Sequence, residues 1–119
     1  MPSLVSPEIE KYAVEHTSPL PGHLEELTRF TYDQMDSPGM LSGPIEGTLL
    51  QFFAWATNAR RVLEIGCFTG FSAQMMAAAL PEGGTVVTCE IDPKAAAVAR
   101  EFFGKSPHAS TSTSRFGMR

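Results

Sequence analysis

The spacing of hydrophobic positions changes partway along the chain. Ile45, Leu49, Phe52, Phe53 and Ala56 follow a helical period, which predicts an amphipathic helix whose apolar face belongs to the core. From residue 61 the pattern becomes two short apolar runs, RVLEIG at 61–66 and TVVTCEI at 85–91, each typical of a buried strand.

A helical pattern, GFSAQMMAAAL at 70–80, and a turn, PEGG at 81–84, separate the two predicted strands. This order forms a β-α-β unit, so we expect the strands to be parallel neighbours. Asp92 and Pro93 then predict the N-cap and first turn of a further helix. Its expected inner stripe consists of Ala95, Val98, Ala99 and Phe102.

Two earlier helices are predicted from their boundaries. Ser6 and Pro7 are typical of a helix start, and the segment SPLPG at 18–22 ends that helix near Thr17. A second helix is expected from about Gly22 to Met35, before the breaker-rich segment DSPGMLSGP at 36–44.

The predicted fold class is α/β, the N-terminal part of a Rossmann-like doubly wound sheet preceded by helices. We expect one partial domain over 1–104, with a helical segment at 1–58 and a β-α-β-α unit at 59–104. The Ser/Thr-rich residues 105–119 predict a disordered tail. A complete doubly wound sheet needs roughly 200 residues, so we expect only its first two strands here.

Composition excludes some partners. The 119 residues carry a net charge of −4 and 43 % hydrophobic residues, and the basic residues are scattered, which argues against nucleic acid as a partner. Apolar runs fall short of the ~20 residues of a membrane span, and the N-terminus does not resemble a signal peptide. We therefore expect a cytoplasmic protein without a membrane partner.

The cysteines and histidines give no sign of a metal or redox site. Cys67 and Cys89 lie in strand-like runs and are predicted to be buried thiols. His16, His23 and His108 show no ligand spacing, so solvated or capping roles are expected.

The loop CFTGFS at 67–72 follows the first predicted strand, where an open α/β sheet binds its ligand. Gly66 permits close approach or a positive φ, and Gly70 permits tight contact between helix and strand. No lysine follows to form a phosphate-binding P-loop. Phe68 occupies the position where a nicotinamide fingerprint has its second glycine, which disfavours that cofactor.

Glu90 lies 20 residues beyond Gly70 at the end of the second predicted strand. An acidic side chain at this position can accept hydrogen bonds from both ribose hydroxyls of an adenosine. The glycine loop, the spacing and Glu90 together favour a nucleoside cofactor. The alternative is that the glycines only shape a turn and that Glu90 is a solvated strand end.

The sequence resembles the S-adenosylmethionine-dependent O-methyltransferases of class I, and in particular the metal-dependent catechol and caffeoyl-coenzyme A enzymes. The similar blocks are YAVEHTSPLP at 12–21, GPIEGTLLQFF at 43–53 and the segment 59–92, with VLEIG-x-x-TG[YF]S as the specific motif. The resemblance covers about residues 8–103, the N-terminal half of such an enzyme.

The resemblance implies a set of cofactor-binding positions. Met40, Leu41 and Ser42 would line the methionine part, and Glu64, Gly66 and Phe68 would face the amino acid portion. Ser72 would contact its carboxylate, Glu90 the ribose, and Ile91 the adenine. With the loop glycine, the expected cofactor-binding residues are Met40, Leu41, Ser42, Glu64, Gly66, Phe68, Gly70, Ser72, Glu90 and Ile91.

The family's reaction transfers the sulfonium methyl of S-adenosylmethionine to a hydroxyl of a small catechol- or phenylpropanoid-like acceptor, commonly held on Mg²⁺. The ligands of that metal follow the fourth and fifth strands, and matching positions are absent here, so no metal ligand or catalytic residue is assigned. The chain is accordingly expected to be a truncated form that is inactive alone, with homodimerisation or pairing with a full-length relative as partner options. The alternatives are a non-catalytic cofactor-binding or interaction remnant and, less favoured, an NAD-dependent oxidoreductase.

Overall fold

The computed structural model of the protein describes residues 4–109. Its elements follow the predicted order closely. They are α1 (Pro7–Glu15), α2 (Gly22–Gln34), a short 3-10 helix η1 (Pro38–Met40), α3 (Gly43–Ala56), β1 (Arg61–Ile65), α4 (Phe71–Ala77), β2 (Thr85–Cys89) and α5 (Pro93–Lys105).

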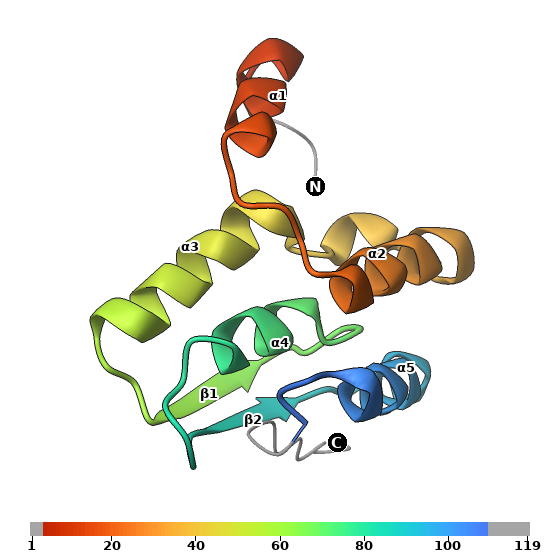
Figure 1. Cartoon of the computed structure of the whole chain (residues 1–119). Coiled ribbons are helices and arrows are strands. Elements are labelled where there is room, and N and C mark those ends of the chain that lie inside the picture. Colours follow the sequence, from red (N-terminus) through yellow and green to blue (C-terminus); the bar gives the residue numbers. More distant parts are fainter. Residues whose placement is uncertain (1–3, 110–119) are drawn as a thin grey trace.

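The two strands pair in parallel, with Arg61 opposite Thr85 and Ile65 opposite Cys89. Figure 1 shows α4 lying over this sheet, with α3 on one side and α5 on the other. The α/β class and the β-α-β unit are thus confirmed.

The core is built around α4, in which every residue except Ser72 is buried. One apolar cluster joins α4 to α2 and α5 and includes Leu27, Phe71 and Phe102. A second joins α4 to α3, β2 and α5 and includes Ala54, Val86 and Phe103. The sheet is therefore covered on the α4 side.

The predicted caps of two helices are confirmed. The Asp92 carboxylate accepts a hydrogen bond from the Lys94 amide at 2.9 Å, and Ser6 caps α1 through the Ile9 amide. The whole expected stripe of α5 is buried, namely Ala95, Val98, Ala99 and Phe102. This helix extends to Lys105, and most of the predicted tail, residues 110–119, lies outside the described residues.

The prediction that residues 61–66 form a buried strand is wrong for one face of β1. Leu63 and Ile65 are 68 % and 84 % exposed, whereas Val62 and Glu64, which alternate with them along the strand, are half-buried. Strands of parallel sheets are buried on both sides only when layers cover both faces. The described residues supply a layer on the α4 face alone.

The prediction for α3 is correct in period and wrong in face. Ile45, Leu49, Phe52 and Phe53 are 39–54 % exposed, and the buried residues of α3 are Gly47 and Ala54. A Cβ atom at Gly47 would lie 2.8 Å from the Phe71 ring. Small residues therefore face α4 because the two helices approach closely, and the four large apolar side chains of the predicted face are exposed.

Among residues 4–109, no helix combines the length and the apolar character that crossing a membrane requires.

Candidate functional site

The loop after β1 is held against the end of β2 by backbone hydrogen bonds. The amides of Gly66 and Cys67 both donate to the Cys89 carbonyl at 3.0 Å, and the Gly70 amide donates to the Cys67 carbonyl. Within this loop Gly66, Phe68 and Gly70 have positive φ values of 94°, 51° and 92°. The chain thus reverses sharply between the strand and α4.

The two loop glycines serve different purposes. A Cβ atom at Gly66 would meet no atom within 4 Å, so this residue leaves open space at the strand end. A Cβ atom at Gly70 would lie 2.9 Å from the Phe103 ring. Gly70 is the N-cap of α4. Its lack of a side chain permits α4 to pack closely on α5, so this residue positions the loop through packing.

A small hollow of about 40 Å³ lies where this loop meets the segment between η1 and α3. Six of its lining residues were predicted from the sequence: Met40, Leu41, Ser42, Gly66, Phe68 and Ser72. Cys67 and Phe71 also line it, although the sequence pattern did not single them out. Residues some 25 positions apart in the chain therefore form one site.

Glu64 is a half-buried carboxylate held by two hydroxyl groups. Ser72 Oγ donates to its Oε2 at 2.5 Å, and Thr88 Oγ1 donates to its Oε1 at 2.7 Å. Burial raises the pKa of Glu64, the nearby Glu90 carboxylate raises it further, and the two hydroxyl hydrogen bonds oppose the shift. Burial is the largest of these effects.

Glu90 joins the end of β2 to the glycine loop. Its Oε2 accepts a hydrogen bond from the Phe68 amide at 2.5 Å, and its Oε1 accepts from the Ile91 and Asp92 amides at 2.9 Å each. The carboxylate therefore links the glycine loop after β1 to the backbone that follows β2. Ile91 is 71 % exposed.

Two threonines that the sequence reasoning missed complete the site. Thr88 is buried and orients Glu64. Thr69, also buried, shares a 2.9 Å hydroxyl hydrogen bond with Thr31 of α2. The alternation of Val86 and Thr88 along β2 was the available signal for an inward-facing hydroxyl.

Cys67 is buried, and burial raises its pKa to about 12. Its thiol is therefore protonated at neutral pH, which agrees with the predicted buried thiol. Cys89 is half-buried, and neither cysteine forms a disulfide.

Comparison with known protein families identifies the class of protein to which the chain belongs. The O-methyltransferase family matches residues 14–117, and the chain belongs to this family. Similar curated proteins include O-methyltransferase ankF of Aspergillus thermomutatus, with 35 % identity over 87 % of this chain and 44 % of the relative. A caffeoyl-CoA O-methyltransferase of Populus kitakamiensis is 36 % identical over 87 % of this chain and 45 % of its own length.

Solved structures show the same fold. The O-methyltransferase from Bacillus cereus in complex with SAH matches with a TM-score of 0.84 and 29 % identity, covering 93 % of this chain and 50 % of that chain. The chain thus spans about half the length of the relatives it matches.

Proposed function

We propose that these residues form the cofactor-binding part of an S-adenosylmethionine-dependent O-methyltransferase. The observation that carries the proposal is the meeting of the glycine loop with Glu64 and Glu90 at the carboxyl ends of two parallel strands. Ligands of open α/β sheets bind at this edge. The acceptor that we propose is a small catechol- or phenylpropanoid-like molecule with a reactive hydroxyl, in line with the caffeoyl-CoA relative.

The charges of the site fit this cofactor. S-adenosylmethionine carries a sulfonium and an ammonium group, and Glu64 and Glu90 bring two carboxylates to the loop. The loop at 66–72 contains no lysine or arginine that would favour a phosphate. When bound, the cofactor supplies an electrophilic methyl group for the acceptor oxygen.

The shape of the site limits how the cofactor is held. The open space above Gly66 accommodates a group close to the backbone. The hollow of about 40 Å³ admits only part of the cofactor, so the remainder would lie over the outward-facing Ile91. A carboxylate offers about four lone-pair sites, and three amides already donate to Glu90. Ribose hydroxyls would therefore share this carboxylate with backbone amides.

The divalent metal of the family does not fit these residues. Among residues 4–109, no three His, Cys, Asp or Glu side chains converge on a point that would hold an ion. Three further expectations stay predictions. The 119 residues alone should show no turnover, the location should be cytoplasmic, and the partner should be either a second copy or a full-length relative.

Calorimetric titration of the 119-residue chain with S-adenosylhomocysteine, S-adenosylmethionine and NAD tests the proposal. We expect heat of binding from the first two ligands and none from NAD. Binding of NAD alone, or of none of the three to chain whose folding has been verified by circular dichroism, would overturn the proposed function.

A further inference from the structure

Thr88 is a buried threonine that is linked to the candidate cofactor site through Glu64. It is 1 % exposed and does not line the hollow at the glycine loop. Its Oγ1 donates a hydrogen bond to Glu64 Oε1 at 2.7 Å. A residue in this position acts on a ligand through the carboxylate that it holds, and not by direct contact.

The other hydroxyl on Glu64 is within reach of a ligand. Ser72 Oγ donates to Glu64 Oε2 at 2.5 Å, and Ser72 lines the hollow. Polar groups of a ligand in the hollow can compete for this hydroxyl, which has a single proton to donate. Thr88 lies outside the lining, and its β-branched side chain restricts rotation about χ1. A ligand that enters the hollow therefore leaves the hydrogen bond from Thr88 in place.

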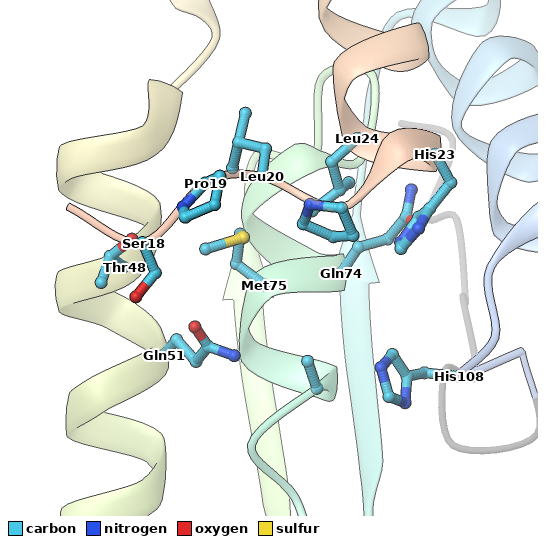
Figure 2. A pocket seen from close by; sticks show the side chains of 12 residues that line it. Ser18, Pro19, Leu20, His23, Leu24, Thr48, Gln51, Gln74, Met75 and His108 are labelled. Carbon is cyan, nitrogen blue, oxygen red and sulfur yellow. The ribbon is translucent and has the colours of Figure 1, made fainter. Parts of the chain in front are cut away.

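The hollow at the glycine loop is separate from a larger cavity beside α4. The larger cavity, of about 320 Å³, lies between the start of α2, α3 and α4 (Figure 2), and its α4 residues are Gln74, Met75 and Ala78. The two cavities share no lining residue. A ligand that acts on Glu64 is thus expected at the glycine loop, and the larger cavity is a reference region that should not respond to it.

Opposing effects act on the Glu64 carboxylate. Burial raises its pKa and the Glu90 carboxylate raises it further, whereas the Ser72 and Thr88 hydroxyls lower it. Hydrogen bonds donated to an ionised carboxylate favour the ionised form. The Cys67 thiol also lies near Glu64, and it stays protonated at neutral pH because burial raises its pKa to about 12. Loss of the Thr88 hydroxyl should therefore favour the neutral form of Glu64.

We propose that Thr88 is a positioning residue for the cofactor, whose hydroxyl holds the Glu64 carboxylate ionised and oriented to accept the ammonium group of S-adenosylmethionine. This inference rests on the proposed function. A protonated Glu64 would be a weaker partner for the ammonium group, because charge-assisted hydrogen bonds are about twice as strong as neutral ones. The cofactor affinity should therefore depend on pH through Glu64, and Thr88 should set the pH at which it is lost.

Titration calorimetry of the 119-residue chain with S-adenosylhomocysteine between about pH 4 and pH 8 tests this role. The affinity of the parent should fall as the pH falls through the titration of Glu64. Thr88→Val should move this loss upward by about one pH unit, because one donor to the ionised form is gone. Thr88→Ala should show the same upward movement, whereas Thr88→Ser keeps the hydroxyl and should retain the parent profile.

Three controls separate this role from a general structural defect. Thr85→Val makes the same chemical change where β2 pairs with Arg61, at the end of the strand away from the glycine loop, and should bind as the parent does. The control ligand is 5′-methylthioadenosine, which lacks the amino acid portion, so parent and Thr88→Val should bind it equally at each pH. In ¹⁵N-resolved NMR spectra, the Ala78 signal of the larger cavity should not respond to S-adenosylhomocysteine.

The titration of Glu64 can also be followed without a ligand. The ¹³C NMR signal of its carboxyl group, assigned by its absence in Glu64→Gln, should titrate at a higher pH in Thr88→Val than in the parent. Equal titration or equal affinity profiles of Thr88→Val and the parent would overturn the role of Thr88 and leave the proposed function standing. A similar loss of 5′-methylthioadenosine affinity in Thr88→Val would also overturn it. A folded parent chain that does not bind S-adenosylhomocysteine at any pH would overturn the proposed function, and this inference with it.

Discussion

Glu90 carries the sharpest prediction about a single side chain. Replacing it with alanine removes the proposed charged acceptor of the ribose hydroxyls, so the affinity for S-adenosylhomocysteine should fall roughly 10- to 100-fold. Isothermal calorimetry measures this change. The control is Glu82→Ala, which removes the same charge from the exposed turn before β2.

Glu90→Ala also removes the acceptor of three backbone amides. A lower melting temperature is therefore expected alongside the lost affinity, and binding is compared well below both transitions. Equal dissociation constants for Glu90→Ala and the parent chain would exclude Glu90 from the site.

Glu64 predicts a pH dependence of stability. Because its pKa is raised in the folded chain above the ordinary value of 4.5, the folded state holds the proton more tightly than the unfolded state. The stability from this group is fully present below pH 4.5 and is lost as the pH rises through the folded pKa.

Urea unfolding at several pH values tests this dependence, with Glu64→Gln as the variant that cannot ionise. The stability of the parent relative to Glu64→Gln should decrease from about pH 4.5 upward. A difference that is constant, or that changes in the opposite direction, would mean that burial does not dominate the pKa of Glu64.

Several residues that line the hollow could be predicted from the sequence, because they are near neighbours in the chain. Gly66, Phe68 and Ser72 belong to one short motif, so their meeting at the hollow follows from the strand-loop-helix order. Thr88 and the pair of Thr31 and Thr69 were not foreseen, because their partners lie 24 and 38 residues away. Such pairings depend on strand register and helix docking, which a local pattern does not specify.

The contact between α4 and α5 depends on the absence of a side chain at Gly70. Gly70→Ala should destabilise the chain by about 1–3 kcal/mol, because alanine disfavours positive φ and its Cβ would press on Phe103. The matched control is Gly104→Ala within α5, where a Cβ meets nothing within 4 Å. That change should stabilise the helix by up to about 1 kcal/mol.

Chemical denaturation of both variants measures these effects. If Gly70→Ala were as stable as the parent, the positive φ and close packing at this position would not be needed for folding. Cofactor affinity should also fall in Gly70→Ala, since the loop that ends at this residue lines the hollow.

The period of a hydrophobic pattern predicts the type of element, but it does not predict which side of that element is buried. The pattern of α3 correctly predicted a helix, yet the small residues Gly47 and Ala54 face the core and Phe52 faces outward. Apolar content alone does not reveal which side of a helix is covered. The same applies to β1, whose continuous apolar run says nothing about whether a layer covers Leu63.

The outward apolar face of β1 predicts self-association of the 119-residue chain. Leu63 and Ile65 are exposed, and the edge of β1 away from β2 has no strand partner within residues 4–109. Exposed apolar strand edges recruit other strands. Sedimentation velocity should show a molecular mass that increases with protein concentration.

Replacing Leu63 and Ile65 together with threonine should reduce the association, because threonine keeps strand propensity and is more polar. The control replaces Ile9 and Val14, two exposed apolar residues of α1, in the same way. A parent chain that stays monomeric across the concentration range contradicts the prediction, as does a β1 variant that associates as strongly as the parent.

Three of the side-chain hydrogen bonds around the glycine loop and the strand ends join residues at most 24 positions apart. Ser72 and Glu64 are 8 positions apart, Phe68 and Glu90 are 22 apart, and Thr88 and Glu64 are 24 apart. Closing such short loops costs little chain entropy. Since ribosomes add ~5–20 residues per second, all three bonds become possible within a few seconds of synthesis of β1, once β2 has emerged from the exit tunnel. These bonds involve only residues 64–90, so the nascent chain can organise its glycine loop as soon as that segment lies outside the tunnel.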